Sequence, residues 1–216
     1  MKIKCRPPLT LTLVLTLIFG MLGAALAQQQ PVTTGAPRAW SVDVTVGSYF
    51  VPDDWYMQPT VIANRGRLHL ESRYNYEDRE SLSVFAGVNL EFGDKVTIAL
   101  TPMFGVLVGR TDAILPALEL DLVWGPIEFY SEAEYIIDVH DRSSSLFYNW
   151  SELSVWPTSW LRGGMVTQRV KIRETDREIQ RGIFAGVGNS KLRGTLYVFK
   201  PGSDDRYAML AVGLTF

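Results

Sequence analysis

The chain has 216 residues, with 21 basic and 23 acidic side chains and a formal net charge of −2 at pH 7. This slightly acidic balance argues against a nucleic-acid partner, because proteins that bind nucleic acids carry an excess of basic side chains. The length suits a single domain, and a single cysteine excludes the class of small scaffolds held together by disulfides.

The first 27 residues have the features of an export signal. Three basic residues precede an apolar run at residues 9–22, and the small residues Ala25 and Ala27 follow it. Secretory signal peptides have this order, and the run is shorter than the roughly 20 residues that a transmembrane anchor needs. We therefore expect a signal peptide at residues 1–27, cleaved after Ala27, and a flexible lead at residues 28–38.

The rest of the chain, residues 39–216, is dominated by stretches in which apolar and polar side chains alternate. Examples are residues 67–76, 81–92, 115–124 and 127–137. Alternation with a period of two is typical of β-strands that have two different faces. A strand in a globular protein is usually about 5 to 6 residues long, whereas a tilted strand of about 9 to 11 residues crosses an outer membrane. Length and alternation together favour transmembrane strands.

Two fold classes produce long alternating strands, and the charges separate them. In a soluble β-sandwich or a lipocalin-like cup, the apolar face turns inward. In a membrane barrel the apolar face turns to lipid and the polar face lines the lumen. Here carboxylates and guanidinium groups lie at strand centres as well as at strand ends, as in residues 67–76 and 127–137. This favours the membrane barrel over the soluble alternative.

The turns give the number of strands. Tight breaks alternate along the chain with more polar connections, as the short periplasmic turns and longer outer loops of bacterial barrels do. The tight breaks are residues 64–66, 93–94, 125–126, 157–159 and 188–190, and the polar connections are 52–54, 77–79, 110–112, 138–145, 171–178 and 201–205. We therefore predict an all-β, closed antiparallel transmembrane barrel of about 12 strands at residues 39–216. A barrel of ten strands, with residues 40–63 outside it, is the alternative.

Aromatic side chains gather at both predicted ends of the strands. Aromatic rings prefer the membrane–water interface, so a barrel is expected to carry two girdles. The predicted periplasmic girdle consists of Trp40, Trp124, Trp156, Trp160 and Phe216, and the predicted outer girdle of Trp55, Tyr56, Tyr74, Tyr76 and Tyr148.

With these features the sequence resembles the bacterial outer-membrane β-barrel proteins of the small porin and OmpA-like class. The resemblance covers the signal peptide, the strands, and a last strand that ends in Phe216 with Leu210, Val212 and Leu214 at alternate positions before it. It implies residence in the outer membrane, contact with its lipid, and recognition of the last strand by the barrel assembly machinery. It identifies no particular member, and fold likeness does not settle function. The oligomeric state stays open.

The alternation places a set of charged side chains inside the barrel. These are Arg67, His69, Glu71, Arg73, Glu119, Asp121, Glu128, Glu132, Glu134 and Arg162. Acidic and basic walls facing each other would orient polar solutes, because charged rings select what passes a pore. We expect a narrow porin-like channel for small polar solutes, with a preference for cations from the excess of carboxylates. The alternative is a plugged structural barrel in which the same charges form salt bridges only.

Catalysis is the less favoured alternative. Asp138 and His140 in an outer loop resemble half of the omptin protease site, where a histidine and its carboxylate activate water. The rest of the omptin spacing is not reproduced, and a lipid-modifying hydrolase would need a serine placed beside the histidine. We therefore expect no enzyme. The sequence shows no metal cluster, phosphate loop or nucleotide fingerprint, so no metal and no cofactor is expected.

Overall fold

The computed structural model describes residues 39–172 and 178–216. The expected signal peptide at residues 1–27 and the expected lead at residues 28–38 lie outside the described residues, as does part of the connection at 171–178. Within the described ranges, no helix has the length and the apolar character needed to cross a membrane.

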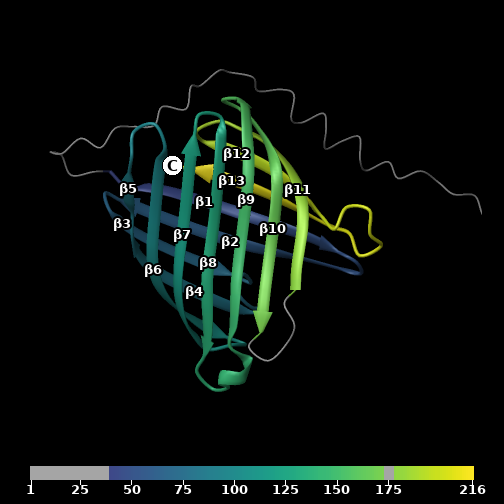
Figure 1. Cartoon of the computed structure of the whole chain (residues 1–216). Helices are drawn as coiled ribbons and strands as arrows, with labels where there is room; N and C mark the ends of the chain where they lie inside the picture. The colour runs from purple at the N-terminus through teal and green to yellow at the C-terminus, as the bar shows by residue number, and fades with distance from the viewer. Residues whose placement is uncertain (1–38, 173–177) are drawn as a thin grey trace, which may run out of the picture.

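The described residues form a closed barrel of antiparallel strands (Figure 1). The strands are β1 Ser41–Val51, β2 Asp54–Arg65, β3 Leu68–Tyr74, β4 Ser81–Val88, β5 Leu90–Phe92, β6 Thr97–Gly109, β7 Ala113–Trp124, β8 Ile127–Asp138, β9 Leu146–Thr158, β10 Leu161–Ile172, β11 Glu178–Gly188, β12 Leu192–Phe199 and β13 Tyr207–Thr215. A single 3-10 turn, η1, covers Arg142–Ser144 in this part of the chain. The expectation of an all-β barrel is confirmed.

Strands β4 and β5 are two parts of one barrel strand, so the number of strands around the barrel is twelve. Gly87 of β4 faces Met103 of β6, and Leu90 of β5 faces Leu100, which is the same register on both sides of the break. Pro102 lies between these two positions on β6. Proline has no backbone N–H to donate to the neighbouring strand, which accounts for the interruption.

The barrel closes where the first strand meets the last. β1 pairs with β13 from Asp43 opposite Thr215 to Phe50 opposite Ala208, and it pairs with β2 along its whole length. The alternative of ten strands with residues 40–63 outside is therefore wrong. Two unpaired strands would leave open edges in the sheet, and a bilayer offers no water to satisfy the backbone groups of those edges.

Side chains alternate between the two faces of the wall as the sequence predicts. In β4, Ser81, Ser83 and Phe85 are buried inside, whereas Leu82 and Val84 are exposed on the outside. The same exterior exposes Val106, Leu118 and Met165 at 49%, 42% and 59% of their surfaces. An apolar exterior of this extent needs an apolar surrounding, which a bilayer supplies.

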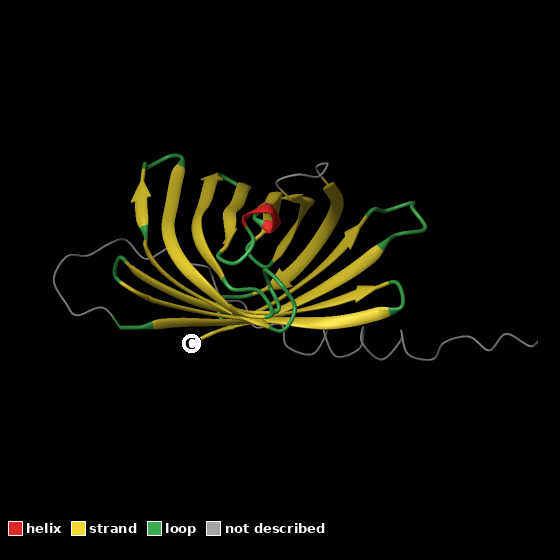
Figure 2. Cartoon of the chain, turned by 90° about the horizontal axis from the view of Figure 1, so that it is seen from below, coloured by secondary structure: helices red, strands yellow, loops and turns green. Residues whose placement is uncertain are grey.

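The two ends of the barrel differ. One end carries short turns, at residues 66–67, 93–96, 125–126, 159–160 and 189–191, and the other carries connections at 52–53, 75–80, 110–112, 139–145 and 200–206. Figure 2 looks at this second end, with η1 facing the viewer. We call them the short-turn end and the long-loop end. The backbone of Phe216 exchanges hydrogen bonds with Val42 at the short-turn end, so the last residue is paired to the first strand.

Much of the barrel interior is packed with apolar side chains, which the alternation pattern did not lead us to expect. One group, the Phe85 cluster, consists of Phe85, Met103, Leu107, Ala113, Leu115 and Ile136; a second, the Trp150 cluster, consists of Trp150, Val166, Phe184, Tyr197 and Phe199. Small inward residues make room for these rings. A Cβ on Gly105 would lie 2.5 Å from the ring of Phe85.

Candidate functional site

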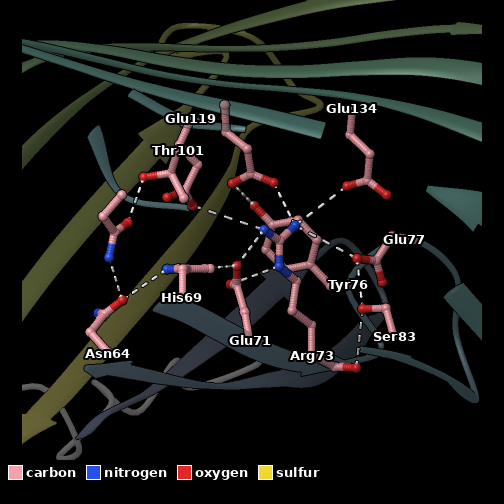
Figure 3. Close-up of polar contacts among 12 residues, drawn as sticks. Asn64, His69, Glu71, Arg73, Tyr76, Glu77, Ser83, Thr101, Glu119 and Glu134 are labelled. Carbon is pink, nitrogen blue, oxygen red and sulfur yellow. Dashed lines mark hydrogen bonds and ion pairs between the residues drawn. The ribbon is translucent and has the colours of Figure 1, made fainter. Parts of the chain in front are cut away.

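Arg73 of β3 is the centre of a buried ion cluster inside the barrel (Figure 3). Its guanidinium donates to both carboxylate oxygens of Glu71, at 2.8 and 2.9 Å. It also donates to Glu132 at 2.5 Å and to Glu134 at 3.4 Å, both from β8. Strands β4, β6 and β7 separate β3 from β8 around the wall, so the Arg73 side chain bridges non-adjacent strands across the interior.

Two further carboxylates and two aromatic rings surround the same guanidinium. Glu77 and Glu119 lie at 3.6 and 4.0 Å from its nitrogens. The rings of Tyr76 and Phe85 lie 4.5 and 4.7 Å from its central carbon, within the range of a cation–π interaction. The Arg73 side chain is 1% exposed, so the surrounding groups cover it almost completely.

Glu77 was missed by sequence reasoning, and Tyr76 was assigned to the outer girdle, because both belong to the β3–β4 connection. Strand β3 ends at Tyr74, and Asn75 adopts the left-handed backbone conformation with a φ of 58°. This turn folds the next two side chains inward, and the Tyr76 hydroxyl donates to Glu132 at 3.0 Å. Alternation stops where a strand stops, so the pattern carries no signal for side chains that return from a loop.

A line of polar contacts leads from the cluster to the break between β4 and β5. The His69 ring contacts Glu71 at 3.4 Å through one nitrogen and Asn64 at 3.1 Å through the other. Asn89 donates to Asn64 at 2.8 Å, and Thr101 donates to Asn89 at 2.9 Å. These groups form a continuous line of polar contacts along one side of the barrel interior.

A second ion pair lies on the other side of the interior. Arg162 of β10 donates to Glu152 of β9 at 3.2 Å, and the same carboxylate accepts from Trp150 at 2.9 Å and from Tyr197 at 2.8 Å. The ring of Phe184 lies 5.0 Å from the Arg162 guanidinium. Acidic and basic groups from separate strands thus meet in direct contact in the Arg73 cluster, rather than facing each other across an open lumen.

Solved structures share this architecture. The structure titled "KdgM porin" has a TM-score of 0.57 and 11% identity, over 81% of this chain and 98% of its own. The structure titled "NanC porin structure in rhombohedral crystal form" has a TM-score of 0.58 and 9% identity, over 81% of this chain and 98% of its own. The chain has the fold of an outer-membrane porin. No protein-family model matches it, and no curated protein sequence matches it.

Nine of the ten predicted lumen charges fall into three groups inside the barrel. His69, Glu71, Arg73, Glu119, Glu132 and Glu134 meet in the Arg73 cluster, and Arg162 joins Glu152. Glu128 and Asp121 are half-buried on the inner wall, and Glu128 accepts a hydrogen bond from the Trp156 indole. Arg67 is a correction: it lies in the β2–β3 turn and is exposed, because the reversal at Gly66 ends the alternation one residue before it.

Several aromatic side chains of the two predicted girdles lie elsewhere in the structure. At the short-turn end, Trp40, Trp124, Trp160 and Phe216 are exposed on 45%, 64%, 47% and 74% of their surfaces. Trp156 faces inward instead, where its indole bonds to Glu128 and its ring lies 5.8 Å from the Arg162 guanidinium. At the long-loop end, Trp55 and Tyr74 are exposed, whereas Tyr56, Tyr76 and Tyr148 pack against other rings or charges inside.

The loop with Asp138 and His140 is organised as a structural turn. The Asp138 carboxylate accepts from the backbone N–H groups of His140 and Asp141, each at 2.7 Å. The His140 ring lies 3.1 Å from Asp112 in the neighbouring loop, and this hydrogen bond lowers the pKa of the Asp112 carboxyl below its ordinary value. The two residues therefore tie loops together and do not form a histidine–carboxylate pair with each other. In the described part of the chain, no group of three His, Cys, Asp or Glu side chains is arranged to hold a metal ion.

The protein has a cavity of about 340 Å³ at its long-loop end. Among the side chains that line it are Tyr49, Tyr56, Gln168, Gln180, Lys200 and Tyr207. Tyr49 and Tyr56 stack with parallel rings 4.9 Å apart, and the Tyr207 hydroxyl donates to Gln180. Amide and hydroxyl groups thus line this cavity, and some of them bond to one another.

Proposed function

We propose that the protein is an outer-membrane channel that passes small polar solutes through a narrow, charged lumen. One observation carries this proposal: charged side chains from β3, β7 and β8 converge on a single point inside a closed barrel with an apolar exterior. A constriction of this kind selects solutes by charge. The likeness to solved porins supports the proposal, and one of the similar structures is titled "KdgM porin in complex with disordered oligogalacturonate".

The lumen of this channel is expected to be narrow. The Phe85 and Trp150 clusters fill much of the interior, and Phe85, Leu115 and Phe199 are buried to within 1% of their surfaces. Beside these clusters lie the line of polar contacts through the buried His69 and the cavity at the mouth beside Tyr49. We therefore expect a small conductance, well below that of a barrel with an open, water-filled lumen.

Location and export complete the proposal. Residues 1–27 would direct export and be removed, and residues 28–38 would remain as a lead before the barrel. The apolar exterior would contact outer-membrane lipid, and the last strand, ending at Phe216, would be the segment that the barrel assembly machinery reads. Pairing of Phe216 with Val42 at the barrel seam is compatible with both roles.

Planar-bilayer recording tests the channel. The refolded protein should give discrete current steps in potassium chloride, and heat-denatured protein should give none. Folding is checked by heat modifiability on gels, because a folded barrel migrates differently before and after boiling. A protein that folds by this criterion and gives no steps would be a plugged structural barrel.

A matched pair of variants locates the constriction. Phe85 faces inward, beneath the Arg73 guanidinium, whereas Phe104 of the adjoining strand β6 is 57% exposed on the outside. Phe85→Ala should enlarge the current steps, because it removes a ring from the narrowest part of the lumen. Phe104→Ala removes the same ring from the exterior and should leave the steps unchanged. Equal conductance in the two variants would contradict a constriction at Arg73.

A further inference from the structure

The Arg73 cluster contains more negative than positive groups. Among the described residues, carboxylates of five glutamates lie within 4.0 Å of the guanidinium of this one arginine: Glu71, Glu77, Glu119, Glu132 and Glu134. Another basic side chain, His69, lies 3.4 Å from Glu71. Arg162 is engaged with Glu152. Even a charged His69 would leave the carboxylates in excess.

Two carboxylate oxygens of this cluster have no hydrogen-bond partner among the described residues. They are Oε2 of Glu77 and Oε1 of Glu134. Their side chains are only 1% and 0% exposed, so bulk water does not solvate them. The other oxygen of each contacts the same atom, Nη1 of Arg73, at 3.6 and 3.4 Å, which places the two carboxylates on one side of the guanidinium. Both point toward Arg73 (Figure 3).

Unpartnered carboxylate oxygens in a buried site are unfavourable, and a bound cation, like a proton, relieves both the repulsion among the carboxylates and the missing contacts. The surroundings suit a cation: Tyr76 and Phe85 already hold a guanidinium against their ring faces. A monovalent ion is the expected occupant, because no group of three His, Cys, Asp or Glu side chains in the described chain is arranged to hold a metal ion. Ca²⁺ and Mg²⁺ need six or more ligands, most of them oxygens.

We propose that Glu77 and Glu134 form a binding site for a monovalent cation beside Arg73, and that the solutes which this channel favours are cations. The inference rests on the proposed channel function. It also separates this chain from a channel for polyanions, because a solute such as oligogalacturonate would meet an excess of carboxylates at the narrowest point of the lumen. Acid-lined constrictions concentrate cations and repel anions.

The test is the reversal potential in a gradient of potassium chloride at pH 7. A passage lined by one sign of charge raises the local concentration of counter-ions about tenfold or more, and we expect K⁺ to be favoured over Cl⁻ by about that factor. Glu77→Gln with Glu134→Gln should bring the permeability ratio most of the way to one. Asp141→Asn, which removes a carboxylate from the exposed loop before η1, should leave the ratio unchanged.

The outcomes separate the two proposals. Absence of current steps in the folded wild-type protein contradicts the channel itself. Current steps with no preference for K⁺ contradict the cation-binding site and leave the proposed channel function standing. This measurement on the wild-type protein decides the inference even where the double variant fails to fold.

A second probe uses guanidinium, the group that the site already holds. Guanidinium chloride added at constant ionic strength should reduce the K⁺ current, because it competes for the Glu77 and Glu134 oxygens next to Arg73. Urea has the same shape without the charge and is the control. Equal effects of guanidinium and urea would overturn the assignment of a cation site.

Discussion

Two arginines near the long-loop end show how burial changes the contribution of an ion pair to stability. Arg73 and Arg79 each lie over an aromatic ring, and each contacts a carboxylate at 2.5–2.6 Å. The side chains of Arg73 and Glu132 are 1% and 5% exposed, whereas those of Arg79 and Asp54 are 44% and 48% exposed. Water solvates the second pair in either state, so only the first has charges that nothing else can satisfy.

Arg73→Ala should therefore destabilise the barrel strongly. Removing one partner of a buried ion pair leaves the other charge uncompensated, which costs about 3–5 kcal/mol. The free energy of unfolding is measured by urea titration of the protein refolded into lipid vesicles. Arg79→Ala is the matched control and should leave the unfolding midpoint nearly unchanged. Similar midpoints for the two variants would show that water reaches the Arg73 cluster.

The pair of Asp112 and His140 makes a prediction about pH outside the barrel wall. The hydrogen bond from His140 lowers the Asp112 pKa, so the contact contributes at pH values above the ordinary carboxyl range and is lost as pH falls through the lowered value. His140→Ala should raise the Asp112 pKa back toward its ordinary value, because the largest cause of its lowering is removed. The carboxyl chemical shift of Asp112 followed by NMR against pH measures it. An unchanged pKa would mean that His140 does not hold this carboxylate in solution.

The same residues show what the sequence could and could not predict about the site. Glu71, Arg73, Glu132 and Glu134 were assigned to the lumen because alternation within a strand fixes which side chains share a face. Alternation does not give distance across the barrel, so the meeting of β3 and β8 at Arg73 was not predictable. Glu77 lies beyond the end of a strand, where the positive φ of Asn75 decides its direction.

At the scale of the elements, facing positions on neighbouring strands determine how the interior fills. Phe85 of β4 lies directly opposite Gly105 of β6, and its ring occupies the space that a side chain at 105 would take. The sequence pattern predicts that both residues face inward. It does not predict that the Phe85 ring lies opposite a glycine, because this depends on the register of the two strands. The packed interior was therefore missed although the strands and their faces were correct.

Gly105→Ala should cost stability by overpacking. The added Cβ would lie 2.5–2.8 Å from three atoms of the Phe85 ring, and the ring or the strand must shift. Such changes cost about 1–3 kcal/mol. Gly194→Ala on β12 is the control, because a Cβ there meets no atom of the described chain within 4 Å; it should be neutral or stabilising by about 0.4–1 kcal/mol. Urea midpoints in vesicles compare the two, and a neutral Gly105→Ala would mean that the ring moves freely.

At the scale of the whole molecule, the closed sheet and the apolar exterior both meet one requirement, which is set by surroundings of low polarity. The pairing of β1 with β13 leaves no open edge in the described wall, and the outward side chains present Val84, Val106 and Leu118. Both features suit a solvent that neither hydrogen-bonds nor solvates charge. The number of strands could be predicted from the sequence because the turns of a membrane barrel alternate between the two sides of the membrane. Tight breaks and polar connections that alternate along the chain therefore count the strands.

Leu118→Arg tests whether that solvent is lipid. Leu118 lies at the middle of β7 and is 42% exposed on the outside of the barrel. An arginine at the middle of a lipid-facing strand costs about 2–4 kcal/mol, because the charge must leave water. The same substitution at Val139, 51% exposed in the loop between β8 and β9, keeps the charge in water and should change stability little. Urea titrations in lipid vesicles give both values. A tolerated Leu118→Arg would place the exterior of the barrel in water and contradict the membrane assignment.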